Sequence, residues 1–398
     1  MRLSFRRSLF AAAIAMSLAN VTVSVAAKSA SSPASAGVAG MPSIHTPSEG
    51  YFFVGGHWEK EGDKDYQVGQ MYVQYLMPKH QRHPNPIVLV HGTAQTGVNF
   101  LGTPDGREGW AQYYADQGYK VYVVDQVGRG RSGTSTEEYG KYARLSAYDM
   151  ESIYTGQENY NLFPQAKLHT QWPGGAGVIG NPSFDQYFAS QVPFIADGRK
   201  TEELVDPALI ALLEKVGPSI LVVHSQAGVF GYKVADERPD LVTALVEIEP
   251  NGPGFYDPDF VGGENWYKYG AKIARPYGIT RVPLKFDPPV KDASDLNPTE
   301  EAQARGPGQV RCYLQGEPAR QLPNLAKTPI SIFTSESSFR ATVDDCESAF
   351  LTQAGVPNDN IHLADLGIHG NGHMMFLEKN NLQVAAAIQR WIETHEKK

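Results

Sequence analysis

The segment from Ile220 to Phe230, ILVVHSQAGVF, decides the fold class. A strand-like apolar run leads directly into Ser225, and the small residues after it begin a helical pattern. A serine in a tight strand-to-helix turn is typical of a nucleophile elbow, whose usual motif has glycine two positions before and two positions after the serine. Here Val223 and Ala227 occupy those positions. The competing interpretation is a serine that only caps the following helix.

Similar apolar runs recur along the chain and alternate with helical patterns. Runs of four to six apolar residues are typical of strands that are covered on both faces, as in a mostly parallel sheet. The alternation predicts an α/β fold with helices on both faces of that sheet. The expected strands are 51–54, 71–77, 87–92, 121–126, 220–225, 244–249 and 330–335, and the expected helices are 110–117, 228–237, 346–354 and 377–394.

Two long segments interrupt this alternation within the domain that we expect over residues 46–398. Residues of about 134–205 and 252–327 are much longer than ordinary connections and are rich in glycine, proline and aromatic residues. We expect both to form a cap over the carboxyl edge of the sheet. The aromatic residues after Asn251 predict either a largely apolar binding pocket or only the packing of a satellite core.

The tripeptide His91-Gly92-Thr93 follows the third expected strand. An oxyanion hole needs one backbone N–H from the residue after the nucleophile and another from the loop after this strand. The expected donors are therefore the amides of Gln226 and Thr93.

Two histidines lie in GIHGNGHMMFLEKNN near the end of the chain, directly before the last expected helix. A general base that serves Ser225 should follow it in sequence and lie on the loop that enters this helix, which favours His373 over His369. Their spacing also resembles a pair of metal ligands, but the intervening Gly-Asn-Gly breaks a helix and no third ligand is apparent, so no metal is expected.

The acidic partner of the base has two candidates. Glu249 ends the strand after the one that carries Ser225, whereas Glu336 follows the next strand, in TSESSF. We favour Glu249, since it would lie at the carboxyl edge of the sheet, level with Ser225. Glu247 is two residues back on the same buried strand and is interpreted as structural.

Two glycine patterns resemble the dinucleotide fingerprint G-x-G-x-x-G. One begins at Gly128 and follows the fourth expected strand rather than the first, and its site would be shared with Arg129 and Arg131. The other begins at Gly175 and follows no strand. Neither has the context that the fingerprint requires, so no cofactor is expected.

The beginning of the chain predicts export. Residues 1–27 have arginines, then a short apolar stretch, then a small-residue cleavage site, as in a signal peptide, and residues 28–45 form a flexible Ser/Ala/Gly/Pro linker. Arg6 and Arg7 leave open a twin-arginine or an ordinary export route. No later stretch reaches the roughly 18 to 20 apolar residues of a membrane span. The location is either periplasmic or secreted.

The net charge and the cysteine content indicate which binding partners are unsuited to the chain and whether it contains a disulfide. Residues 1–27 contain three arginines and no acidic residue, so their removal changes the formal charge from −8 to −11. Such an acidic chain is a poor candidate for binding nucleic acid or anionic membrane surfaces. Cys312 and Cys346 are the two cysteines, and export favours a disulfide between them over two buried thiols.

The chain resembles the α/β-hydrolase superfamily through HGT at His91, DQVGRGRS at Asp125, HSQAG at His224 and GHMMFLE at Gly372, in the order typical of the superfamily. It is similar, more narrowly, to exported bacterial esterases that share FFVGG, MYVQY, the HSQ elbow and a glutamate after the sixth strand. In that branch cysteines can follow the HG motif, whereas Thr93 and Ala94 stand there in this chain.

The resemblance implies a serine carboxylesterase. Ser225 would be its nucleophile, His373 its base, Glu249 its acid, and the amides of Thr93 and Gln226 its oxyanion hole. The expected partner is a small or polymeric ester, and the sequence does not decide between a monomer and a homodimer. Three alternatives stay open: cleavage of amides, cleavage of lactones or polyesters, and a non-catalytic ligand-binding protein on the same fold.

Overall fold

The computed structural model describes residues 48–252 and 254–397. The expected signal peptide (1–27), the expected linker (28–45) and residues 46–47 of the expected domain lie outside these residues. The helices within the described ranges include none that is both long enough and apolar enough to cross a bilayer.

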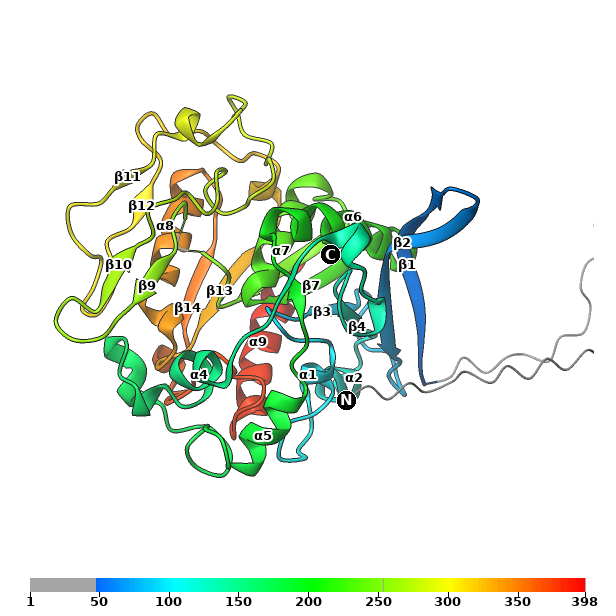
Figure 1. Ribbon diagram of the computed structural model, residues 1–398, viewed down its shortest axis with the longest axis horizontal. Helices are drawn as coiled ribbons and strands as arrows, with labels where there is room; N and C mark the ends of the chain where they lie inside the picture. Colours follow the sequence, from blue (N-terminus) through cyan, green and yellow to red (C-terminus); the bar gives the residue numbers. More distant parts are fainter. Residues whose placement is uncertain (1–47, 253, 398) are drawn as a thin grey trace, which may run out of the picture. The chain divides into compact units, whose positions relative to one another are not determined.

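A central sheet of eight strands organises the described chain, in the order β1-β2-β4-β3-β7-β8-β13-β14 (Figure 1). β2 is antiparallel to both of its neighbours, and the other adjacent pairs are parallel. The strands are β1 (Glu49–Glu61), β2 (Lys64–Leu76), β3 (Ile87–Val90), β4 (Val121–Asp125), β7 (Ser219–His224), β8 (Val242–Ile248), β13 (Ile330–Thr334) and β14 (Asp359–His362).

Helices cover both faces of this sheet, which confirms the predicted α/β class. Successive side chains of β7 point to opposite faces of the sheet, each of which has its own hydrophobic core. Leu221 and Val223 pack with one set of helices, whereas Ile220 and Val222 pack with the other. The first set is α6 (Gly198–Val216), α7 (Gly228–Glu237) and α8 (Asp344–Gln353), and the second is α1 (Val98–Leu101), α2 (Trp110–Asp116) and α9 (Asn381–His395).

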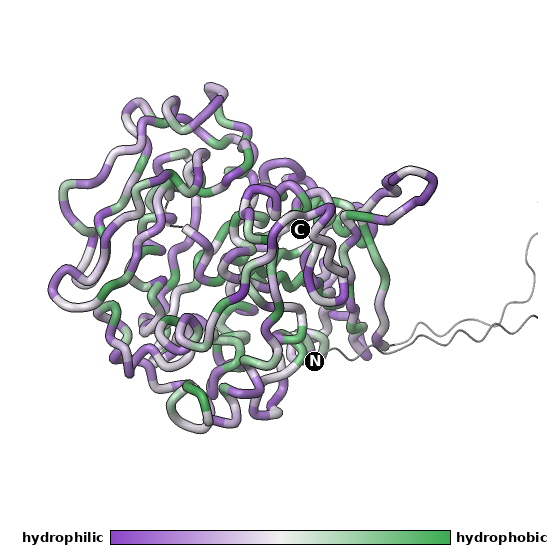
Figure 2. The backbone as a smooth tube through the Cα atoms, in the orientation of Figure 1, coloured by the Kyte–Doolittle hydropathy of each residue, from purple (hydrophilic) through white to green (hydrophobic). Residues whose placement is uncertain are grey.

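The long hairpin of β1 and β2 forms one edge of the sheet. Its base packs on α6, whereas the trace of its outer turn is largely hydrophilic (Figure 2). The strands are much longer than the apolar runs that predicted them, since most of their outer residues are polar and exposed.

Both long insertions form short elements rather than further layers. The first contains α3 (Thr136–Tyr139), β5 (Tyr142–Ala143), α4 (Ala147–Met150), a π-helical turn (Glu151–Thr155), 3₁₀ turns (Gln157–Asn159, Pro164–Leu168), α5 (Pro182–Ala189) and β6 (Phe194–Ile195). The second contains β9 (Pro258–Phe260), β10 (Tyr267–Tyr269), a 3₁₀ turn (Ala293–Leu296), β11 (Thr299–Glu300), β12 (Tyr313–Leu314) and a 3₁₀ turn (Leu325–Lys327).

Three further features differ from the sequence prediction. The first insertion was expected to reach residue 205, but α6 begins at Gly198, where Asp197 caps it by accepting hydrogen bonds from the amides of Arg199 and Lys200. β14 was not predicted, because the strand reads DNIH and lies at a sheet edge. α9 begins at Asn381 rather than at residue 377, since residues 373–380 form buried turns before it.

Candidate functional site

Ser225 lies at a sharp turn between β7 and α7. Its φ of +54° places it in the left-handed region, which non-glycine residues seldom adopt. A 3₁₀ turn over Ser225–Ala227 leads directly into α7, and the amide of Asn251 donates a hydrogen bond of 2.8 Å to the carbonyl oxygen of Ser225. The sequence therefore folds here into the strained strand-to-helix turn that the elbow pattern predicted.

A glycine in α7 explains why valine is tolerated at position 223. A Cβ atom placed on Gly231 would lie 3.0 Å from Val223 Cγ2 and 2.6 Å from Glu247 Oε1. The space that the usual motif provides before the serine is thus provided by the facing helix, six residues after Ser225.

The loop after β3 packs closely against the elbow. A Cβ on Gly92 would lie 3.0 Å from Ser225 Cβ and 2.9 Å from His224 Nδ1, so only glycine fits. The preceding His91 is buried and accepts a hydrogen bond at Nε2 from the amide of Gln126, at 3.1 Å. Burial, reinforced by the charge of Arg129, lowers the pKa of His91 to about 3, so its ring is neutral.

His373 and Glu249 form a buried hydrogen-bonded pair. His373 Nδ1 and Glu249 Oε2 are 2.5 Å apart, and both side chains are almost fully buried. Glu249 follows β8 directly and also has a positive φ, of +47°. This contact leaves Nε2 of His373 as the nitrogen that can accept a proton.

Two serines after β13 hold the carboxylate of Glu249. The amide of Ser335 donates to Oε1, and the hydroxyl of Ser338 donates to Oε2, each at 2.7 Å. Burial raises the pKa of Glu249 to about 8, although these hydrogen bonds and the charge of Arg340 oppose the shift.

The ring of His373 packs against Phe339 and Tyr154, two residues that line the same pocket as Ser225. Its centroid lies 4.5 Å from that of His224, 4.8 Å from that of Phe339 and 5.1 Å from that of Tyr154. Burial lowers the pKa of His373 well below its usual value, and the charge of Arg340 acts in the same direction. The imidazole is therefore neutral at neutral pH, the form that can act as a base.

The alternative pair, Glu336 and His369, meets elsewhere. Glu336 Oε1 lies 3.1 Å from His369 Nδ1, and Oε2 accepts a hydrogen bond from the amide of Gly370. The side chain of His369 is 62% exposed, whereas that of His373 is 1% exposed. Each histidine thus has a different glutamate, and no group of three or more His, Cys, Asp or Glu side chains in the described ranges could hold a metal ion.

The pocket, called here the Ser225 pocket, has a volume of about 360 Å³. Thr93 and Ser225 lie in its wall with residues from both insertions, and its aromatic members are Tyr154, Phe260 and Phe339. Arg340 also lines it, but its guanidinium donates to Gly252 O at 2.6 Å and to Asn251 Oδ1 at 3.0 Å. The insertions therefore do form walls of the pocket around Ser225.

Arg129 is a site residue that the sequence did not reveal. It is buried, and its guanidinium donates to Gly92 O and to Gln226 Oε1, each at 2.8 Å. It therefore joins the loop that carries Thr93 to the residue after Ser225. The stretch around Arg129 was weighed as a nucleotide motif and as part of the superfamily resemblance, but neither interpretation gave Arg129 a role; its position after β4 was the available signal.

A buried histidine joins the first insertion to the loop that carries His373. His169 Nδ1 lies 2.8 Å from Glu158 Oε2, and its Nε2 lies 2.8 Å from Glu378 Oε1. Glu378 also accepts a hydrogen bond from the amide of Gly372, next to His373. Burial by itself would lower the pKa of His169, but the two carboxylates outweigh it and raise the pKa to about 9.

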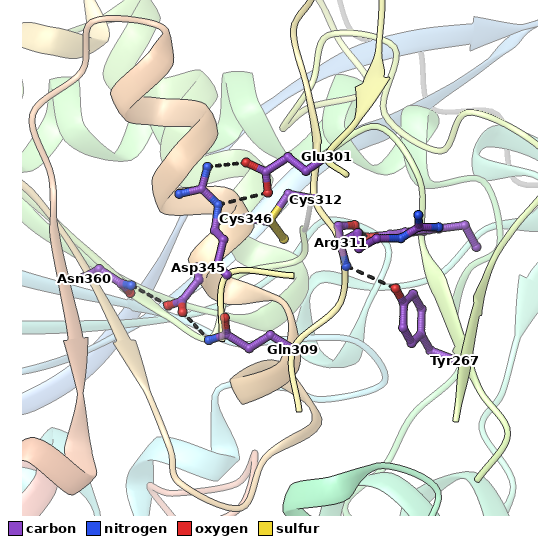
Figure 3. The surroundings of a disulfide bond; sticks show 10 residues. Tyr267, Glu301, Gln309, Arg311, Cys312, Asp345, Cys346 and Asn360 are labelled. Carbon is purple, nitrogen blue, oxygen red and sulfur yellow. Dashed lines mark hydrogen bonds and ion pairs between the residues drawn. A yellow bond between two sulfur atoms is a disulfide. The ribbon is translucent and has the colours of Figure 1, made fainter. Parts of the chain in front are cut away.

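A disulfide between Cys312 and Cys346 fastens the second insertion to α8, as expected from the sequence (Figure 3). Beside it, Asp345 accepts hydrogen bonds from Gln309 of the insertion and from Asn360 of β14. Closing the 34-residue separation stabilises the fold by about 4 kcal/mol in the chain-entropy model.

The sheet order, the elbow and the loops around it define the class, and the chain belongs to the α/β-hydrolase family. The family model described as "alpha/beta hydrolase fold" matches residues 85–277. The chain is 40% identical over 344 residues to a protein of Fungal sp. (strain ATCC 74256) named probable secreted lipase phiG, over 86% of this chain and 89% of the relative. The fold of this chain is similar to that of a bacterial esterase whose structure has been solved, with a TM-score of 0.56. The two are 24% identical, and the match covers 88% of this chain and 96% of the esterase.

Proposed function

We propose that this protein is an exported serine carboxylesterase. Ser225 is its nucleophile, His373 the general base, and Glu249 the acid that orients His373. The amides of Thr93 and Gln226 form the oxyanion hole. No metal or other cofactor takes part in this reaction.

One observation carries the proposal: Glu249 and His373 are paired at 2.5 Å, in a buried position beside the pocket that Ser225 lines. A carboxylate on Nδ1 fixes the tautomer in which Nε2 is free to accept a proton. The positive φ of Ser225, as in a nucleophile elbow, and the glycine at position 92, which lets the HGT loop approach the serine, support the same assignment.

The reaction has two steps. As Ser225 Oγ attacks the ester carbonyl carbon, its proton passes to His373 Nε2, and the carbonyl oxygen becomes an oxyanion that the two amides bind. Collapse of this intermediate releases the alcohol, which takes the proton from His373, and leaves an acyl group on Ser225. Water, deprotonated by His373, then attacks the acyl group, and His373 returns the proton to Ser225 Oγ as the bond between the acyl carbon and Oγ breaks and the acid leaves.

An ester substrate is favoured by the relatives and by the pocket. The fungal relative is named a lipase, a class that cleaves carboxylic esters, and the aromatic side chains in the Ser225 pocket fit an apolar acyl or alcohol group. Export rests on the signal-like sequence of residues 1–27, the disulfide and the word "secreted" in the name of the relative. Neither the periplasm nor the exterior is favoured.

Labelling with a fluorophosphonate probe, followed by peptide mapping, tests the nucleophile. We expect the label on Ser225, and we expect Ser225→Ala to lose at least about 10³-fold in kcat on p-nitrophenyl esters. Ser348→Ala, in α8, is the matched control and should keep full activity. An active Ser225→Ala protein would show that the assignment is wrong.

The alternatives give different outcomes. Turnover of anilides at a rate comparable to that of esters would indicate an amidase, and turnover confined to lactones or polyesters would indicate those classes. A folded protein that neither hydrolyses esters nor reacts with the probe would instead be a ligand-binding member of the fold.

A further inference from the structure

The backbone beside His373 is held by the carboxylate of Glu378. The amide of Gly372 donates hydrogen bonds to both oxygens of this carboxylate, at 2.9 and 3.1 Å, and the side-chain amide of Asn371 donates to Oε2 at 2.7 Å. The side chain of Glu378 is fully buried, so these donors have no water to replace it. Because His373 directly follows Gly372, the position of His373 depends on this carboxylate.

Glu378 is in turn connected to the first insertion through His169. One nitrogen of the buried His169 ring contacts Glu378 and the other contacts Glu158, each at 2.8 Å. A carboxylate accepts hydrogen bonds, and only the protonated imidazole donates from both nitrogens. His169 is therefore an imidazolium, and two charge-assisted hydrogen bonds connect Glu158 with Glu378.

The first insertion also packs against Gly372 itself. A Cβ atom placed on Gly372 would lie 2.5 Å from Gln157 Nε2 and 3.2 Å from His169 Nε2. Gln157 and Glu158 lie in the same 3₁₀ turn, which ends at Asn159. The turn that provides Glu158 is thus in close contact with the backbone beside His373.

The preceding turn of the same segment lines the substrate pocket. Tyr154 belongs to the wall of the Ser225 pocket, and its ring centroid lies 5.1 Å from that of His373. The π-helical turn that contains Tyr154 ends at Thr155, and the 3₁₀ turn with Glu158 begins at Gln157. A substrate that packs on Tyr154 therefore contacts the segment that is connected to the loop of His373.

We propose that Glu158, His169 and Glu378 are positioning residues for His373, through which the first insertion fixes the backbone that carries the proposed base. In the wall of the Ser225 pocket, as residues 48–252 and 254–397 form it, none of these three side chains takes part. Their effect is therefore on turnover and not on substrate binding. This inference rests on the proposed function, in which His373 takes the proton of Ser225.

Glu158→Gln is the first test, because its side chain is partly exposed and its replacement leaves the contact between Glu378 and Gly372 in place. We expect kcat on p-nitrophenyl esters to fall about 10-fold, since a small displacement of a base slows turnover strongly, and we expect KM to change less than twofold. His169→Gln removes the charge between the two carboxylates and should lower kcat by about 10- to 100-fold. Thermal melting checks that each variant is folded.

A matched control and a double variant separate positioning from a general effect of losing an ion pair. His362 on β14 also pairs with a carboxylate, that of Asp345 at 2.9 Å, and His362→Gln should keep the kcat of wild type. Because Glu158 acts through His169, Glu158→Gln/His169→Gln should be no slower than His169→Gln. Losses of kcat that multiply in the double variant, or an increase in KM with kcat unchanged, would overturn the proposal.

A measurement on His373 itself is independent of turnover. The proton between His373 Nδ1 and Glu249 Oε2 should give a proton NMR signal far downfield, and His373→Gln should remove that signal. We expect the signal to shift or broaden in Glu158→Gln and in His169→Gln but not in His362→Gln. This result would support the positioning role even if wild type hydrolysed no ester, whereas a signal that is the same in all three variants would overturn it.

Discussion

The hydroxyl of Ser338 donates a hydrogen bond of 2.7 Å to Oε2 of Glu249, the same oxygen that contacts His373. Glu249, the proposed acid after β8, is thus held by a serine that follows β13. In the proposed site the loop after β13 provides hydrogen bonds to this carboxylate rather than the acid itself.

This contact predicts how activity depends on pH. Because burial raises the pKa of Glu249 to about 8, the carboxylate that orients His373 forms only as the pH rises through that value. We expect kcat/KM for a neutral ester to rise with a midpoint near pH 8. Removing the hydroxyl with Ser338→Ala removes a hydrogen bond that stabilises the charged form, so the midpoint should move upward by about one pH unit.

Two variants of neighbouring residues control this experiment. Ser338→Thr keeps a hydroxyl and should restore the wild-type midpoint. Ser337→Ala removes a hydroxyl that donates to Asn371 rather than to Glu249, so it should leave the midpoint unchanged. A Ser338→Ala profile that overlays the wild-type profile would contradict the role of this contact.

Arg129 should affect turnover more than substrate binding. It joins Gly92 to Gln226 across the expected oxyanion hole, and the oxyanion exists only after attack on the carbonyl. Arg129→Met should therefore lower kcat by roughly 10- to 100-fold with little change in KM. Arg129→Lys, which can keep only part of the bridge, should fall in between. A change confined to KM would show that Arg129 serves binding instead, and thermal melting of each variant identifies any general loss of stability.

The fold was predictable because buried parallel strands appear in sequence as continuous apolar runs. The strands before Thr93, Ser225 and Glu249 are of this kind; Ser225 and Glu249 follow their strands directly, and Thr93 lies three residues after the end of β3. β14 escaped the prediction because it is a short polar edge strand, and α6 escaped it because Pro207 and many charged residues weaken its helical pattern. Chain order was sufficient to name the candidate residues.

The supporting contacts could not be predicted in the same way. Ser338, Arg129 and His169 act through partners 89, 97 and 209 residues away, and their loops follow paths that no periodicity encodes. The substitution of valine for glycine at position 223 seemed to weaken the elbow motif. Its explanation lies in Gly231, a residue that the motif does not include.

Gly231→Ala tests that explanation. The added methyl group would lie 2.6 Å from Glu247 Oε1 and 3.0 Å from Val223 Cγ2, inside a closed core. We expect the free energy of unfolding to fall by about 1 to 3 kcal/mol, measured by denaturant titration. Gly102→Ala is a suitable control, because its backbone is extended and its added Cβ would meet nothing closer than 3.6 Å. If Gly231→Ala were as stable as wild type, the close packing of α7 on β7 would not explain Val223.

His169 should make the stability of the protein depend on pH above neutrality. Its folded pKa of about 9 lies above the ordinary histidine value of 6.5, so its ion pairs with Glu158 and Glu378 stabilise the fold fully below pH 6.5. This contribution, at most about 3 kcal/mol, is lost as the pH rises from 6.5 through 9. His169→Gln should therefore be less stable than wild type at pH 6, and the difference should shrink toward pH 10. A gap between His169→Gln and wild type that stays constant from pH 6 to 10 would mean that packing, rather than charge, is what His169 contributes.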